Sequence, residues 1–314
     1  MTSSATPRVA VIGAGQIGRG WAALLVSRGW SVGLFDPVTA VAESARVEVG
    51  ERVGALTQAG LADASAVRAG LATFRSGRSL LQVITDADWV IEAGPDDLAQ
   101  RQRTLEQIEQ VCRLAAILTS SSQRFHASDL CARLRRPERL LCVNPYPPVE
   151  YLPVIEVIPG PRTEPACTAD VELWLRRLGR WPVVLKKEVP GNISGRIAAA
   201  VWREALQLVL DGVIAVEDLD RAVAAGPALA LTAAGPGLGL AVAAGDRDLS
   251  TYLSTVLLTY QEWWAAHPAR TSVDGEELHR LVRAISRAYD AQLPTQTIEH
   301  RRRLAALVKA LQQP

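Results

Sequence analysis

Three glycines near the N-terminus have the spacing of a phosphate-binding turn. The segment Gly13-Ala14-Gly15-Gln16-Ile17-Gly18 follows an apolar run at Arg8–Ile12 and precedes a stretch with apolar residues at helical spacing. In such a turn the first glycine permits a tight bend, the second lets a pyrophosphate approach the backbone, and the third lets helix and strand pack closely. Amides at the start of the helix supply donors to the phosphates. The motif therefore predicts a dinucleotide site, against the alternative of a glycine-rich turn that binds nothing.

Asp36 bears on which dinucleotide would bind. It follows the second predicted strand, Val32–Phe35, at about the 20-residue spacing that the motif requires. A carboxylate at this position can accept hydrogen bonds from the ribose hydroxyls of NAD, and it repels the 2′-phosphate of NADP. The next residue is Pro37, and no arginine follows before Arg46. NAD(H) is therefore the predicted cofactor, and NADP(H) is disfavoured.

Glu156 is the second residue that could do chemistry. It lies within Val154–Ile158, a run whose β-branched residues predict a strand buried on both faces. An isolated carboxylate in such a strand is costly. Left unpaired, it would be expected to be protonated or to find a backbone partner.

Strands and helices alternate in the first half of the chain. Arg8–Ile12, the following helical segment and Val32–Phe35 predict a βαβ unit. The alternation continues and predicts an α/β fold with a Rossmann-type, doubly wound and mostly parallel sheet. Further strands are expected at Trp89–Glu92, Ala116–Thr119, Leu140–Val143, Val154–Ile158 and Pro182–Leu185, and a helix at Leu98–Cys112.

The pattern changes after Pro190-Gly191, where apolar residues recur at mostly helical spacings and Gly212 is a predicted helix end. We therefore predict an NAD-binding domain over residues 1–188 and an all-helical domain over residues 189–314. The segment Pro227–Ala244 carries no charge, but Gly235-Pro236 interrupts it. This favours a buried helix–turn–helix piece over a membrane span.

Composition argues against several classes of function. A net charge of +1 provides no field that would attract nucleic acid or an anionic membrane. Cys112, Cys131, Cys142 and Cys167 lack the spacing of metal ligands or of a disulfide framework, so buried thiols and no metal site are expected. The polar first residues run directly into a strand, which predicts no secretory signal and a cytoplasmic protein.

Five longer stretches are typical of one enzyme family: VAVIGAGQIGRGWA (Val9–Ala22), DWVIEAGPDDLAQRQ (Asp88–Gln102), NPYPPVEYLPVIEVIP (Asn144–Pro159), VPGNISGRI (Val189–Ile197) and EALQLVLDGVIAVEDLD (Glu204–Asp220). With them the chain resembles the 3-hydroxyacyl-CoA dehydrogenase family, particularly its branch with lambda-crystallin and L-gulonate 3-dehydrogenase. The resemblance implies a homodimer formed through the helical half and a small-molecule or carrier-bound substrate. It adds Ala93, Asp96, Arg101 and Ser120 to the expected cofactor contacts.

The resemblance also places the family's catalytic residues, a His–Glu pair assisted by a serine and an asparagine. Glu156 falls at the glutamate. Aligned without gaps, the histidine falls on Asn144, and an alternative register with gaps puts Leu141 there; neither is a base. The remaining matches are Gln123 for the serine, Gly195 for the asparagine, and Ala230 near an arginine that the branch uses beside an anionic substrate group.

Three hypotheses follow for the function. In the first, hydride transfer at a C–OH/C=O centre survives, with Tyr146, Glu156 or His126 moving the proton in place of the missing histidine. In the second, the substrate is an imine or iminium, which needs no strong acid, and an unpaired Glu156 stabilises its charge. In the third, the protein binds NAD(H) without catalysis, as a pseudoenzyme or structural protein.

Overall fold

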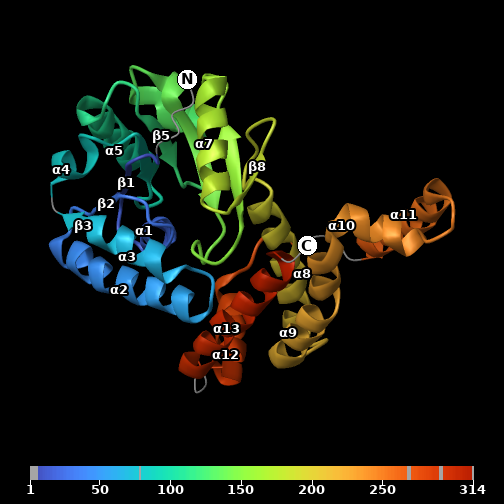
Figure 1. Cartoon of the computed structure of the whole chain (residues 1–314). Coiled ribbons are helices and arrows are strands. Elements are labelled where there is room, and N and C mark those ends of the chain that lie inside the picture. The colour runs from blue at the N-terminus through green and yellow to red at the C-terminus, as the bar shows by residue number, and fades with distance from the viewer. Residues whose placement is uncertain (1–5, 78, 267–269, 290–292, 313–314) are drawn as a thin grey trace. The chain divides into compact units, whose positions relative to one another are not determined.

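The computed structural model describes residues 6–77, 79–266, 270–289 and 293–312. The chain folds into two compact units, Met1–Arg196 together with Ile298–Pro314, and Ile197–Thr297. Each unit is built around its own set of elements (Figure 1). The division into functional domains at residue 188 stays a prediction.

The first unit contains an eight-stranded sheet in the order β3-β2-β1-β4-β5-β6-β7-β8. Neighbouring strands are parallel except β6 and β7, which are antiparallel. This confirms the predicted Rossmann-type, mostly parallel sheet. The strands are β1 (Val9–Ile12), β2 (Val32–Phe35), β3 (Arg75–Gly77), β4 (Trp89–Glu92), β5 (Ile117–Ser120), β6 (Leu140–Pro145), β7 (Val154–Pro159) and β8 (Trp181–Val184).

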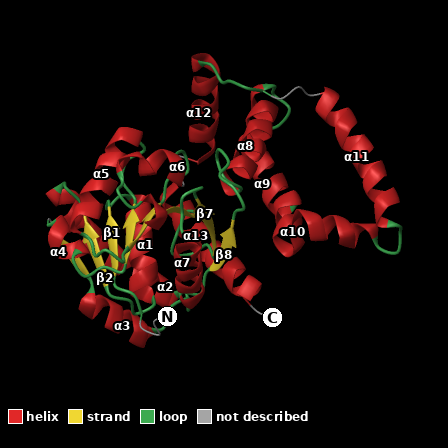
Figure 2. Cartoon of the chain, turned by 90° about the horizontal axis from the view of Figure 1, so that it is seen from above, coloured by secondary structure: helices red, strands yellow, loops and turns green. Residues whose placement is uncertain are grey.

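Helices cover both faces of this sheet (Figure 2). Successive residues of β1 show why: Val9 and Val11 pack in one core, while Ala10 and Ile12 pack in the other. The first core is closed by α1 (Gln16–Ser27), α2 (Thr39–Gln58), α3 (Ala64–Thr73) and α7 (Pro165–Arg177). The second is closed by α4 (Leu80–Ile84), α5 (Leu98–Val111), α6 (Ala127–Leu130) and the short 3-10 helix η1 (Cys131–Arg133), which η2 (Pro137–Arg139) follows.

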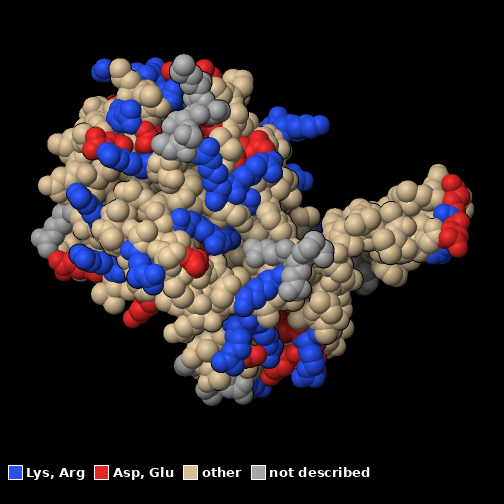
Figure 3. All heavy atoms as spheres, in the orientation of Figure 1, with Lys and Arg blue, Asp and Glu red and all other residues tan. Residues whose placement is uncertain are grey.

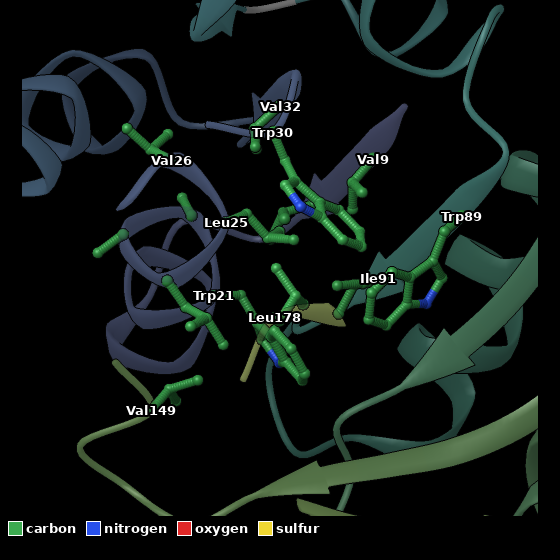
Figure 4. Close-up of a cluster of buried hydrophobic side chains, with 14 of the residues drawn as sticks. Val9, Trp21, Leu25, Val26, Trp30, Val32, Trp89, Ile91, Val149 and Leu178 are labelled. Atoms are coloured by element: carbon green, nitrogen blue, oxygen red, sulfur yellow. The ribbon is translucent and has the colours of Figure 1, made fainter. Parts of the chain in front are cut away.

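Tryptophans fill the centre of the first core (Figure 4). Trp21 and Trp89 are fully buried, and their rings meet edge to face with centroids 5.7 Å apart. Each indole N–H has a partner: Trp21 donates to Ser121 Oγ and Trp89 donates to Thr119 Oγ1, both at 2.9 Å. Large buried rings with satisfied polar atoms contribute strongly to a core. They give a rigid support to α1, which carries Gln16, Ile17 and Gly18, and to β4, which Ala93 follows.

In the described residues of the second unit, every secondary-structure element is a helix, and turns or loops join them. It contains the greater part of α8 (Ser194–Leu210), then α9 (Val216–Ala225), α10 (Pro227–Ala244), α11 (Leu249–Ala266) and α12 (Gly275–Tyr289). The predicted helix end at Gly212 is confirmed, because that glycine has φ +71° two residues after α8. The last helix, α13 (Leu293–Gln312), belongs mainly to the first unit, where Ala305 packs against Leu56 and Tyr151.

Helix α10 departs from the prediction in one respect. It is broken at Gly235, which has φ 70° and ψ 169°, so the predicted interruption is confirmed. The expectation that the segment is buried is wrong for the single chain, because Leu238 and Val242 are more than half exposed. Among the described residues it is the one helix with the length and hydropathy of a membrane span, and only 6% of it is buried. The apolar sequence of α10 predicts that its surface is buried against something. It does not say whether the same chain or another molecule buries it.

Candidate functional site

The three glycines of the turn after β1 have different surroundings. Gly13 has φ +105°, and a Cβ there would lie 2.6 Å from the carbonyl oxygen of Ala93. A Cβ on Gly18 would lie 1.8 Å from the carbonyl oxygen of Gly13. These two glycines are required by the fold itself. A Cβ on Gly15 would meet nothing within 4 Å, so the space in front of this residue is open to a ligand.

The N-terminus of α1 begins at this open position. Gly15 is the N-cap, no side chain caps the helix, and the amide of Arg19 is the one that bonds back to Gly15, at 2.9 Å. The preceding amides, including those of Gln16 and Ile17, therefore have no partner within the helix. Such an end attracts anions through its amides and through the helix dipole. The turn fits the pyrophosphate of a dinucleotide.

Asp36 lies directly after β2, beside the turn. Its two carboxylate oxygens accept hydrogen bonds from the amides of Ala14 and Val38, each at 2.9 Å. The carboxylate is half-buried, and each oxygen retains lone-pair capacity for a further donor. Asp36 thus shapes the turn and can also accept hydrogen bonds from ribose hydroxyls.

A buried ion pair supports the other side of the turn. Arg101 of α5 contacts Glu92 at the end of β4 at 2.6 Å, and it donates to the carbonyl oxygen of Gly94 at 2.7 Å. Ser120 donates to the same carboxylate at 2.6 Å. Arg101 and Ser120 are therefore brought together beneath the β4–α5 loop that contains Ala93. Asp96, by contrast, is exposed, 3.9 Å from Arg124.

Glu156 is held by three donors. Its Oε1 accepts from the backbone amides of Ile193 and Ser194, at 3.0 and 2.7 Å, at the start of α8. Its Oε2 accepts from Nδ2 of Asn144 at 3.4 Å. The backbone partner expected for this buried carboxylate is therefore present, at the positive end of a helix, and the unpaired carboxylate that the imine hypothesis requires is not observed. Strand composition could not reveal donors 37 and 38 residues further along the chain.

The strand register decides which residue faces Glu156. Asn144 is its direct neighbour across the antiparallel β6–β7 pair, whereas Leu141 is paired with Pro159. Asn144 is buried, and Leu141 belongs to the apolar core. Asn144, and not Leu141, is therefore the residue that faces Glu156.

The remaining sequence candidates are spread out. Tyr146 is half-buried on the β6–β7 loop, two residues past Asn144, and the loop contains a cis peptide between Pro147 and Pro148. Gln123 is exposed on the loop after β5. His126 takes a structural part, because it forms a capping box with Asp129 at the start of α6. Gly195 lies in the first turn of α8, and Ala230 belongs to the second unit.

Comparison with known proteins decides the family. The family model described as "3-hydroxyacyl-CoA dehydrogenase, NAD binding domain" matches residues 8–189. The chain belongs to the 3-hydroxyacyl-CoA dehydrogenase family. It is similar to the L-carnitine dehydrogenases of Nocardiopsis dassonvillei (30% identity over 99% of this chain and 94% of that protein) and Burkholderia mallei (35% identity over 78% and 75%).

Two further comparisons extend this result. The match to the L-carnitine dehydrogenase/betainyl-CoA thioesterase of Ruegeria pomeroyi, at 32% identity over 78% of this chain, spans half of that longer protein. Among solved structures, an NAD⁺-dependent 5-formyl-3-hydroxy-2-methylpyridine-4-carboxylic acid 5-dehydrogenase superposes with a TM-score of 0.84, at 28% identity over 98% of this chain and 99% of that one. Together, these comparisons show that the present chain is an NAD-dependent dehydrogenase of the 3-hydroxyacyl-CoA dehydrogenase family.

Several charged residues that the fold gathers near the turn and the β6–β7 loop were not predicted from the sequence. Arg52 of α2 contacts both Gln16 and Glu150, and the guanidinium of Arg180 donates to the carbonyl oxygens of residues 150–152. Burial lowers the pKa of Arg180 to about 9. Glu92 carried a signal related to that of Glu156, because it is an acidic residue at the end of an apolar run, whereas Glu156 lies within one. Arg52 carried no comparable signal, because arginines are common on exposed helix faces.

Proposed function

We propose that this protein catalyses NAD(H)-dependent hydride transfer at the C–OH/C=O centre of a small or carrier-bound hydroxy acid, with Asn144 at the position of the family's histidine. The observation that carries the proposal is the register pair of Asn144 and Glu156 near the end of β6, at the same edge of the sheet as the open dinucleotide turn after β1. L-Carnitine, named in several relatives, is a secondary alcohol of this class. The lambda-crystallin and L-gulonate branch remains a second source of candidate substrates.

The site residues would have the following roles in the reaction. NAD⁺, when bound, supplies the hydride acceptor for alcohol oxidation. Glu156 accepts from Nδ2 of Asn144, so Oδ1 of Asn144 points away from it and can accept a hydrogen bond from a substrate hydroxyl. An amide orients the hydroxyl but does not take its proton, and a missing general base costs about 10²–10⁴ in rate. We propose Tyr146, on the loop that follows β6, as the proton carrier: its phenol oxygen accepts the hydroxyl proton while its own proton passes to water.

The imine hypothesis has less support than this one. It relied on an unpaired Glu156 that would stabilise a cationic substrate, and that carboxylate already accepts three hydrogen bonds. The non-catalytic hypothesis predicted a backbone partner for Glu156, which the amides of Ile193 and Ser194 provide. That arrangement also suits an enzyme, because a held carboxylate orients Asn144.

NADH titration of the wild-type protein and Gly15→Ala tests the cofactor site. Gly15 has φ −71°, which alanine adopts, so the variant should fold with unchanged stability. Its methyl group would occupy the space proposed for the pyrophosphate. Losing one charge-assisted hydrogen bond, worth about 1.5–3 kcal/mol, weakens binding roughly 10- to 150-fold. The measurement is the enhancement of NADH fluorescence, with Gly54→Ala on α2 as a matched control that should bind normally.

NADPH provides the second arm of that titration. Because Asp36 lies beside the turn and repels a 2′-phosphate, NADPH should bind much more weakly than NADH. Equal affinity of wild type and Gly15→Ala for NADH, or no binding by wild type, would refute the cofactor proposal.

A substrate screen that follows NADH absorbance separates the three hypotheses. Hydroxy acids such as L-carnitine and L-gulonate, hydroxyacyl thioesters, and cyclic imines form its three panels. Turnover of a hydroxy acid or thioester supports the proposal, and also distinguishes a free from a carrier-bound substrate. Turnover of imines alone would replace the proposal with the imine-reductase hypothesis. No turnover in any panel would favour the hypothesis that the protein binds NAD(H) without catalysis.

We further propose a cytoplasmic homodimer that buries the apolar surface of the second unit. Figure 3 shows the α10–α11 segment as almost free of charged residues along its length. Its exposed apolar side chains include Leu238, Val242, Leu258, Trp263 and Trp264. A second copy suits this surface better than a bilayer, because the break at Gly235 leaves backbone groups that lipid would not satisfy.

Sedimentation velocity tests the dimer. Wild type should sediment as a dimer, and Val242→Asp should shift it toward monomer. Leu114→Asp, at an exposed apolar residue of the first unit, is the matched control and should remain dimeric. A monomeric wild type that co-sediments with lipid vesicles would overturn the proposal in favour of a membrane surface.

A further inference from the structure

A network of charged side chains connects the dinucleotide turn to the β6–β7 loop. Arg19 of α1 donates through Nε to the carbonyl oxygen of Ala14 in the turn, at 2.7 Å, and its Nη1 pairs with Glu48 of α2. Glu48 accepts from Nε and Nη2 of Arg52, at 3.0 and 2.6 Å. The network then reaches Glu150 of the β6–β7 loop, through a contact of 3.0 Å with Arg52.

Arg52 is the branch point of this network. Its Nη1 pairs with Glu150, while its Nη2 donates to the side-chain oxygen of Gln16 at 2.5 Å. Gln16 is the first residue of α1, at the helix end proposed to hold the pyrophosphate. One planar guanidinium thus holds the cofactor turn and the loop of Tyr146 at fixed positions relative to each other. A lysine ammonium is a point charge and does not reproduce this forked geometry.

The loop end of the network is buried. The side chain of Glu150 is 3% exposed and that of Arg52 is 10% exposed. The second oxygen of Glu150 has no hydrogen-bond partner among the described residues. A buried carboxylate with one ion-pair contact depends strongly on that partner. Arg180 holds the backbone carbonyl oxygens of residues 150–152, so the part of the loop that responds to the position of Arg52 is the side chain of Glu150 and the residues before it.

We propose that Arg52 is a positioning residue that couples occupation of the dinucleotide turn to ordering of the β6–β7 loop. This inference rests on the cofactor site proposed above. When a dinucleotide fixes the first turn of α1, Gln16 is fixed, Arg52 loses freedom, and Glu150 with the preceding residues of its loop is held more firmly. The cofactor then prepares the loop that carries Tyr146, directly after the strand of Asn144, before the substrate arrives.

Hydrogen–deuterium exchange of a peptide covering residues 146–152 tests the coupling. The amides of Tyr151 and Leu152 donate to the carbonyl oxygen of Pro148 at 3.0 and 3.1 Å, so their exchange reports on loop opening. Saturating NADH should slow this exchange about 5- to 150-fold in wild type, the range of ordinary coupling between sites. Arg52→Met should abolish the NADH-dependent part. Arg46→Met, an exposed arginine on the same helix, should retain it.

Gln16→Ala provides an independent arm that leaves the ion pair between Arg52 and Glu150 in place. The NADH-dependent slowing should be lost, while exchange without NADH stays at the wild-type rate. Slowing that persists in both Arg52→Met and Gln16→Ala would overturn the coupling. Wild type that binds NADH without slower exchange would overturn the coupling alone, whereas wild type that does not bind NADH would also overturn the proposed function.

Discussion

Replacement of Glu156 should reveal how strongly one carboxylate anchors the start of α8. In Glu156→Leu the amides of Ile193 and Ser194 lose their acceptor inside the protein. A buried polar group left unsatisfied costs about 1–3 kcal/mol, so two amides cost about 2–6 kcal/mol. The lost interaction of the charge with the helix dipole adds up to about 2 kcal/mol in a buried geometry. Partial solvation of the freed amides should leave a net loss of about 3–5 kcal/mol.

Glu156→Gln divides this loss into two parts. Glutamine retains an oxygen that can accept from the amides, so only the contribution of the charge disappears. We expect about 1–2 kcal/mol for this variant. Its comparison with Glu156→Leu therefore separates hydrogen bonding from electrostatics at the same position.

Urea denaturation at neutral pH measures both values, provided that the slope m stays constant. Glu51→Gln, at an exposed position of α2, is the control and should lie within about 0.5 kcal/mol of wild type. If Glu156→Leu unfolds within 1 kcal/mol of wild type, the carboxylate does not anchor α8. A loss in Glu156→Gln as large as in Glu156→Leu would mean that the charge, rather than the acceptor geometry, accounts for the effect.

Three further predictions concern other parts of the chain. Asn144→His places a base against Glu156 and should raise the rate on the hydroxy substrate found by the screen by up to about 10²–10⁴-fold, measured as kcat. The hydrogen bond from Tyr289 to Asp220 raises the pKa of the phenol to about 12. The stabilising effect of this hydrogen bond is therefore complete below pH 10 and is lost as the pH rises through about 12. In urea titrations at alkaline pH, Tyr289→Phe should be less stable than wild type at pH 9 and equal to it near pH 12. Burial raises the pKa of the thiols of Cys112, Cys142 and Cys167, so labelling by a disulfide reagent at pH 7 should be slow until urea unfolds the protein.

The sequence predicted most of the sheet because its strands are apolar runs that need little context. Seven strands were expected within two residues of their observed bounds. Strand β3, Arg75–Gly77, was missed because an edge strand of Arg, Ser and Gly has neither β-branched residues nor alternation. The exposure of α10 was also missed, since hydropathy does not say which chain covers a surface.

The candidate site was predictable only where it is local in sequence. The glycine turn and Asp36 form a motif within one βαβ unit, and their observed geometry agrees with the spacing rules. The partners of Glu156 are different, because two of them come from a helix end that tertiary folding brings to the strand. Arg52 and Glu150 are 98 residues apart. No periodicity connects such pairs, so a single sequence does not reveal them.

The distribution of tryptophans gives this protein two separate optical reporters. Trp21 and Trp89 are sealed in the core of the first unit, whereas Trp202, Trp263 and Trp264 of the second unit are each more than half exposed. A collisional quencher such as acrylamide should therefore extinguish the red-shifted emission of the exposed group first and leave the blue-shifted emission of the core. Protection of the exposed group at high protein concentration would report association through the second unit, and a red shift of the core emission would report unfolding of the first.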